Sequence, residues 1–196
     1  LNKSLPASRM RGESMEEAVL EDRKSVVIVS PATAAANNGN WHTAARWQQF
    51  LQSDFDTEIT QHWLPTGANA AKSFTAMIAL HARRSADSIA AWAQTFPGRE
   101  LIVVLTGTDL YRDIRTDASA QRSLELATQL VVLQGAGLEE LSPQHRAKTQ
   151  VIYQSCPRAA PAPKASHFTA LMVGHLRDEK DPFTYLRAAQ RLKHRP

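Results

Sequence analysis

The chain has 196 residues, of which 43% are hydrophobic and 21% charged, and its formal net charge at pH 7 is +4. This composition is ordinary for a globular protein, and no apolar run approaches the roughly 20 residues that a membrane-spanning helix needs. The single cysteine, Cys156, excludes an internal disulfide and a zinc site built from several cysteines. We therefore expect no membrane span and a reducing, cytoplasmic location.

Positive charge is concentrated toward the C-terminal end, where residues 142–196 carry 10 lysines and arginines against 3 aspartates and glutamates. A basic segment is one signature of nucleic-acid binding, but this one has no recognisable nucleic-acid motif and few aromatic side chains. We expect no nucleic-acid partner and attribute much of this charge to a solvated helix face beside a phosphate site.

Residues 1–24 are polar and lack the apolar core of a signal peptide, so we expect a flexible extension without an assigned function. The first regular unit follows directly. Residues 25–30 are an unbroken, mostly β-branched run, which predicts a strand buried on both faces, hence a central and parallel one. Helical periodicity begins at Trp41 and reaches Leu51, with Asn40 as the expected N-cap.

The loop between this strand and this helix is a candidate phosphate site. In open α/β sheets ligands bind outside the carboxyl ends of the strands, and the N-terminus of a helix favours anions. The candidate phosphate-binding residues are Asn38, Gly39 and Asn40. The alternative is a structural turn, because a single glycine falls far short of a dinucleotide-binding fingerprint.

An Asp-x-Asp sequence, Asp54 to Asp56, precedes a second expected strand at residues 57–62. Such a pair can hold a divalent metal beside a diphosphate. Here it lies at the amino end of the strand, the wrong end of a parallel sheet for a ligand. We therefore expect no metal site.

Residues 74–80 predict another buried strand, and a basic cluster of His81, Arg83 and Arg84 follows its carboxyl end. Forked guanidinium donors match phosphate oxygens, so this cluster is a candidate anion site. The alternative is that both arginines are solvated and His81 caps the strand.

A helix is expected from Ser85 until Pro97, and residues 101–105 predict the next strand. Polar side chains again collect at its carboxyl end, namely Thr106, Thr108, Asp109 and Arg112. Asp109 either caps the following turn or accepts a hydrogen bond from a substrate hydroxyl.

Further elements complete one domain. Asp117 is expected to cap a helix, and the remaining elements are strands at 130–133 and 151–153 and a short helix at 134–141. Alternating strands and helices indicate an α/β fold, a Rossmann-like domain with a parallel sheet spanning residues 25–154.

A proline-rich stretch at residues 155–167 has the composition of a semi-rigid hinge. Beyond it, residues 169–173 predict a strand, and Pro182 fits the first turn of a helix that Asp181 caps. A single strand–helix unit does not bury its own apolar surface. We therefore interpret residues 168–196 as the incomplete start of a second Rossmann-like domain.

This layout resembles the opening part of a glycosyltransferase with the two-domain GT-B fold. The segment VGHLRDEKD at residues 173–181 is similar to the G-R-L-x-x-E-K-G loop of retaining, family-4-like members, in which basic residues hold the donor diphosphate. Lys180 matches the family lysine. His175 stands where the family has arginine and Asp181 where it has glycine, so the resemblance implies an altered diphosphate site.

Four separated strings resemble more closely the selenosugar synthases of selenoneine biosynthesis, which are bacterial GT-B enzymes: PATAAANNGNWHTAARW, ALHARRSADSIA, VVLTGTDLYRDI and VGHLRDEKDP. The resemblance covers the chain from about Ser25 onward. It implies transfer of a sugar from a UDP-sugar to selenophosphate, with formation of a carbon–selenium bond. The UDP-sugar is a substrate, and we expect no cofactor and no metal, because helix N-termini and basic side chains can stabilise a leaving diphosphate.

The expected site has three parts. The donor-phosphate ligands are Asn38, Gly39, Asn40, Gly174, Arg177 and Lys180. The acceptor ligands are Arg83, Arg84, Thr106 and Arg112. His81 and Asp109 belong to the catalytic centre, where they position and polarise groups, since an anionic nucleophile needs no strong base.

Two alternatives stay open at this point. One is a hexose or N-acetylglucosamine transferase that acts on a hydroxyl acceptor. The other is a truncated, non-catalytic Rossmann-like remnant, whose exposed apolar faces near Leu171 and Leu186 would favour self-association. The sequence leaves the sugar, the anomer and the oligomeric state undetermined.

Overall fold

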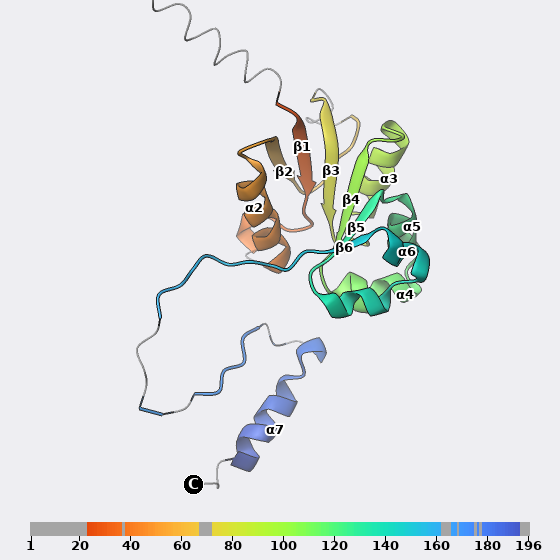
Figure 1. Ribbon diagram of the computed structural model, residues 1–196. Helices are drawn as coiled ribbons and strands as arrows, with labels where there is room; N and C mark the ends of the chain where they lie inside the picture. The colour runs from red at the N-terminus through yellow and green to blue at the C-terminus, as the bar shows by residue number, and fades with distance from the viewer. Residues whose placement is uncertain are drawn as a thin grey trace, which may run out of the picture. The chain divides into compact units, whose positions relative to one another are not determined.

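The computed structural model describes residues 23–36, 38–66, 72–161, 166–167, 169–174, 176 and 178–192. The chain divides into two compact units, Leu1–Ser155 and Cys156–Pro196. Figure 1 labels the helices and strands of both units.

The first unit is built on a six-stranded sheet in the order β2-β1-β3-β4-β5-β6, and every neighbouring pair is parallel. The strands are β1 (Ser25–Val29), β2 (Asp56–Thr60), β3 (Phe74–Leu80), β4 (Glu100–Leu105), β5 (Gln129–Val132) and β6 (Thr149–Val151). The predicted α/β class with a Rossmann-like parallel sheet is thereby confirmed.

Helices and short helical turns connect the strands. In the first unit they are η1 (Ala34–Ala36), α2 (Gly39–Leu51), α3 (Ala86–Thr95), the π-helical turn η2 (Asp109–Asp113), α4 (Ile114–Thr116), α5 (Ala118–Leu126), η3 (Gly135–Glu140) and α6 (Pro143–Ala147). The second unit contains η4 (Asp178–Lys180) and α7 (Pro182–Leu192). No helix in the described ranges is long and apolar enough to cross a bilayer.

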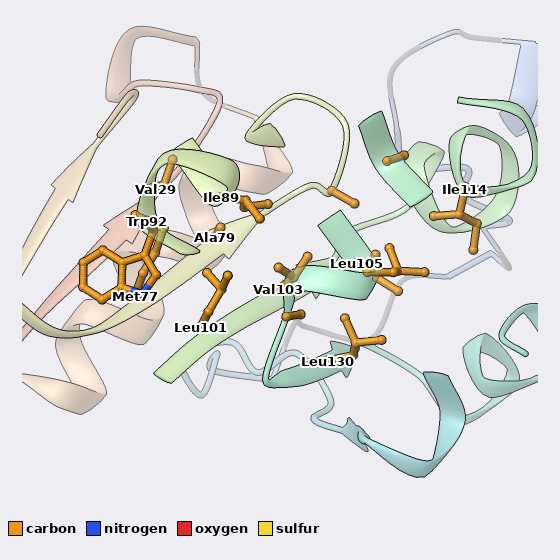
Figure 2. Packing of buried hydrophobic residues seen from close by; sticks show 14 of the residues in the cluster. Val29, Met77, Ala79, Ile89, Trp92, Leu101, Val103, Leu105, Ile114 and Leu130 are labelled. Atoms are coloured by element: carbon orange, nitrogen blue, oxygen red, sulfur yellow. The ribbon is translucent and has the colours of Figure 1, made fainter. Parts of the chain in front are cut away.

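The β-branched run of β1 is buried on both faces, as its sequence predicts. Val27 and Val29 pack in a core with the α3 residues Ile89 and Trp92. Figure 2 shows Val29, Ile89 and Trp92 in this core. Val26 and Ile28 face the other way and pack in a second core, to which α2 contributes Ala44. The sheet is therefore covered by α2 on one face and by α3 and α5 on the other.

All strand carboxyl ends lie at one edge of the sheet, which we call the carboxyl edge. The chain leaves β1 for α2 and returns in β2 on one side, whereas β3 and all later strands add on the other side. The strand order therefore reverses between β1 and β3. In doubly wound sheets, ligands bind at the carboxyl edge beside such a reversal.

Some local expectations for the first unit differ from the structure. Asn38, and not Asn40, is the N-cap of α2, because its side-chain oxygen accepts hydrogen bonds from the backbone N–H groups of Asn40 and Trp41. The last strand covers Thr149–Val151 and not 151–153, and helix α6 before it was not predicted. Asp117 caps α5 as expected, accepting from the Ala120 N–H at 2.9 Å.

The second unit contains the predicted helix but not the predicted strand. Asp181 caps α7, accepting from the Thr184 N–H at 3.2 Å. Residues 169–173 have no regular secondary structure. A strand is stabilised by the ladder with its neighbour, and the described part of this unit offers none. Large apolar side chains there, including Leu171, Val173 and Leu186, are exposed.

Candidate functional site

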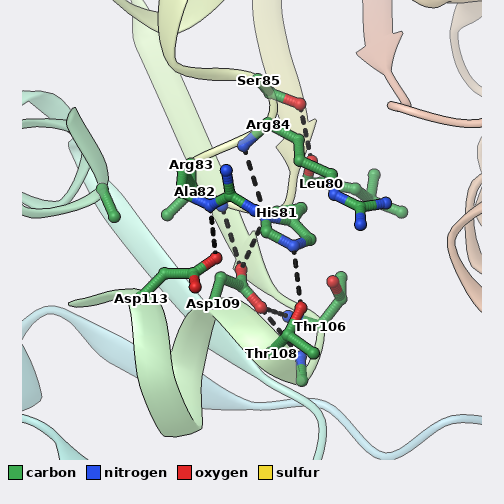
Figure 3. A network of polar contacts seen from close by, with 12 residues as sticks. Leu80, His81, Ala82, Arg83, Arg84, Ser85, Thr106, Thr108, Asp109 and Asp113 are labelled. Carbon is green, nitrogen blue, oxygen red and sulfur yellow. Dashed lines mark hydrogen bonds and ion pairs between the residues drawn. The ribbon is translucent and has the colours of Figure 1, made fainter. Parts of the chain in front are cut away.

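The candidate site is formed by two loops at the carboxyl edge, one after β3 and one after β4. Figure 3 shows the loop from His81 to Ser85 facing the loop from Thr106 to Asp109. Ser85 holds the first loop by donating its hydroxyl to the Leu80 carbonyl at 2.6 Å. These are the two segments in which the sequence analysis expected acceptor binding and catalysis.

Asp109 ties the two loops together. Its side chain is completely buried, and Oδ2 accepts a hydrogen bond from the Ala82 N–H at 2.9 Å. Oδ1 accepts from the backbone N–H groups of Thr106 at 3.0 Å and Gly107 at 2.9 Å. Asp109 thus fixes the turn that precedes it, at Thr106 and Gly107, and anchors the loop after β3; it does not cap the following turn, which was the structural alternative. Its predicted contact with a substrate hydroxyl stays a prediction.

His81 is a buried, neutral histidine held at both ring nitrogens. Nδ1 lies 3.3 Å from the Arg84 backbone N–H, so it acts as an acceptor and carries no proton. Nε2 must then carry the ring proton, which it donates to the Thr108 hydroxyl at 3.1 Å. The 3.9 Å between Nδ1 and Asp109 Oδ2 is too long for a hydrogen bond. Burial lowers the pKa of His81, and this effect outweighs the nearby Asp109 charge, which raises the pKa; the lowered pKa agrees with the neutral ring.

The backbone of both loops departs from ordinary strand or helix geometry. His81 has φ 72°, in the left-handed region where histidine is tolerated better than most side chains. Gly107 has φ 147°, a value that favours glycine. The Tyr111 N–H donates to the Gly107 carbonyl at 3.0 Å, next to the π-helical turn η2. Unusual backbone and π-helical turns are found frequently at functional sites.

Two of the three expected acceptor-binding arginines meet on one carboxylate that the sequence analysis missed. Asp113, only 5% exposed, accepts from Arg83 Nε at 2.7 Å and from Arg112 Nε at 3.0 Å. Burial by itself would raise the pKa of Asp113, but the hydrogen bonds and charges of both arginines outweigh it and hold the pKa below its ordinary value. Asp113 is therefore ionised at neutral pH.

Arg84 lies apart from this ion-pair cluster. Its side chain is exposed, and Figure 3 shows its guanidinium on the other side of the His81 ring from that of Arg83. Thr106, the fourth expected acceptor ligand, is half-buried and gives its backbone N–H to Asp109. The structure thus brings the expected acceptor residues to one edge, but in two groups on either side of His81.

The expected donor-phosphate residues are distributed over both units. The backbone N–H of Asn40, one of the donors a phosphate would use, is already taken by the Asn38 side chain. In the second unit, Gly174 has φ 155°, and Lys180 is exposed in η4. Arg177 lies outside the described residues.

No protein-family model matches the sequence, and no curated protein matches it. The resemblance to selenosugar synthases therefore rests on the sequence strings alone.

Proposed function

We propose that the protein is a glycosyltransferase that moves a sugar from a UDP-sugar to selenophosphate, forming a carbon–selenium bond. The acceptor approaches the carboxyl edge between β3 and β4. The proposal combines the sequence resemblance with the chemistry of that edge.

The observation that carries the proposal is a set of arginines next to a histidine and an aspartate whose acceptor atoms already accept hydrogen bonds from backbone N–H groups. His81 Nδ1 accepts from a backbone N–H, and Asp109 accepts three such bonds. Neither group is poised to take a proton from a hydroxyl acceptor. Arg83, Arg84 and Arg112 supply positive charge at the same edge. Arginines beside a histidine and an aspartate that already accept backbone hydrogen bonds suit an acceptor that arrives as an anion and needs no deprotonation.

The reaction needs few steps from the protein. A selenium lone pair of selenophosphate attacks the anomeric carbon, the bond from that carbon to the UDP oxygen breaks, and UDP leaves with the electron pair. The arginines hold the phosphate oxygens of the acceptor and direct its selenium toward the sugar. For the leaving diphosphate, the sequence resemblance implies basic donor ligands, Lys180 and Arg177 among them.

The test is UDP release by the natural full-length protein, measured with selenophosphate and, separately, with sugar hydroxyl acceptors. We expect release that depends on selenophosphate. Arg84→Ala should raise the KM for selenophosphate several-fold with a smaller change in kcat, because Arg84 is exposed and its loss leaves the fold intact. Arg115→Ala is the matched control, since Arg115 pairs with Glu140 and not with the site.

Two results would overturn the proposal. UDP release that depends only on hydroxyl acceptors would make the protein an ordinary hexose or N-acetylglucosamine transferase. Absence of UDP release with every acceptor would leave a non-catalytic α/β domain.

A further inference from the structure

Arg83, Asp113 and Arg112 form a cluster that we call the arginine clamp. The two arginines come from different segments: Arg83 follows β3, and Arg112 lies in η2. Each donates its Nε–H to a different oxygen of the same carboxylate, at 2.7 and 3.0 Å. Figure 3 shows the half of this clamp made by Arg83 and Asp113.

Burial differs sharply across the clamp. The Asp113 side chain is 6% exposed, whereas the side chains of Arg83 and Arg112 are 37% and 58% exposed. The carboxylate therefore lies on the inner side and the arginines on the outer side. Guanidinium is planar and carries five N–H donors in a fixed fork, so fixing one donor on Asp113 also fixes the plane of the others.

We propose that Asp113 is a positioning residue that holds Arg83 and Arg112 in place to bind one tetrahedral oxyanion, the phosphate group of the acceptor. This inference rests on the proposed function for the identity of the acceptor, but its anion binding can be tested without turnover. Long side chains lose rotamer freedom when they bind a ligand, and a clamp already ordered by Asp113 avoids part of that cost.

A simple electrostatic account makes the opposite prediction. If Asp113 acted only through its charge, replacing it with a neutral residue would strengthen anion binding at the neighbouring arginines. If it acts by orienting the arginines, the same change weakens anion binding in spite of the more positive potential. The sign of the effect distinguishes the two accounts.

The experiment titrates inorganic phosphate into the 196-residue chain, with calorimetry or ³¹P NMR as the readout. We expect Asp113→Asn to weaken phosphate binding roughly tenfold, the size of one charge-assisted hydrogen bond. The matched control is Asp117→Asn, which removes a carboxylate whose charge also acts on Arg83. Asparagine caps helices as well as aspartate, so this control keeps α5 intact and should bind phosphate at least as tightly as the parent chain.

Arg112→Lys is a second variant, which tests the same proposal if Asp113→Asn fails to fold. It keeps the charge and changes an exposed side chain, but it removes the fork, so phosphate binding should weaken with only a small change in the melting temperature. Arg115→Lys is its control. In the full-length enzyme, Asp113→Asn should raise the acceptor KM far more than it lowers kcat, and Asp113→Glu should restore part of the loss.

Unchanged or tighter phosphate binding by Asp113→Asn overturns the clamp, as does a parent chain that binds no phosphate. Either result leaves glycosyl transfer itself standing. Conversely, phosphate binding that depends on Asp113 in a protein that releases no UDP supports the clamp and refutes the proposed function.

Discussion

Replacing Asp109 tests how much the two loops at the carboxyl edge, and with them the folded state, are stabilised by one buried carboxylate. Asp109→Ala removes the acceptor of three backbone N–H groups, those of Ala82, Thr106 and Gly107. The Ala82 N–H is in a buried residue, and leaving it unpaired costs about 1–3 kcal/mol. Thr106 and Gly107 are half-buried, so water can replace part of the loss, and each contributes about 1 kcal/mol. We expect a total loss of about 4 kcal/mol in the free energy of unfolding.

Urea unfolding followed by tryptophan fluorescence measures this loss, because Trp63 and Trp92 are buried in the first unit. With a slope of about 2 kcal/mol per M, the midpoint should fall by about 2 M. Asp109→Asn should lower the free energy of unfolding by about half as much. The asparagine amide oxygen can still accept from the N–H groups at one of the two carboxylate oxygen positions, whereas its NH₂ group meets N–H donors at the other and forms no hydrogen bond there. Asp54→Asn, an exposed control, should stay within about 0.5 kcal/mol of the parent. A loss below about 1 kcal/mol for Asp109→Ala would refute the structural role assigned to this carboxylate.

Three further predictions follow from the loops and their caps. Asn38→Ala should lower the free energy of unfolding by about 1 kcal/mol in the same urea assay, whereas Asn40→Ala should change it by less than about 0.5 kcal/mol; the reverse order would contradict the cap seen here. Gly107→Ala should lower the free energy of unfolding by about 1–3 kcal/mol through backbone strain alone, because the added Cβ would meet no atom within 4 Å. Gly39→Ala, at the start of α2, should leave the free energy of unfolding unchanged or raise it. Equal changes in the two variants would refute the strain argument. The pKa of His81 is lowered in the folded state, so on acidification the unfolded chain binds this proton first, and the free energy of unfolding should fall as the pH drops below about 6.5. His81→Asn should lose less of this free energy between about pH 7 and 5 than the parent chain. An equal loss in both proteins would contradict a buried neutral ring.

Most of the first unit could be predicted from the sequence because its strands are buried runs with strong periodicity. The expected bounds of β3 match the structure at both ends. The cap of α2 was harder, because Asn38 and Asn40 are the same residue type two positions apart. Which of them reaches the free N–H groups depends on where the helix begins, and composition does not determine that.

The candidate site was predictable in its place but not in its contacts. A parallel sheet brings the ends of β3 and β4 together, so His81, Asp109 and Arg83 were expected at one edge. The partners of Asp109 are backbone N–H groups, which every residue carries, so no sequence pattern marks them. Asp113 was missed for a related reason: its pairing with Arg83 joins segments 30 residues apart.

The predicted strand at residues 169–173 shows the limit of local patterns. An apolar run predicts a strand only if a neighbour completes its ladder, and the described part of the second unit contains no such neighbour. Helix α7 forms without that help because its hydrogen bonds are internal and Asp181 caps it.

The most direct test of the central claim is NMR of the product formed by the full-length protein from a ¹³C-labelled UDP-sugar and ⁷⁷Se-labelled selenophosphate. Our account predicts a coupling between the anomeric carbon and selenium, together with one UDP released for each bond formed. A product whose anomeric carbon is bonded to oxygen, or a labelled sugar that remains attached to UDP, would contradict it.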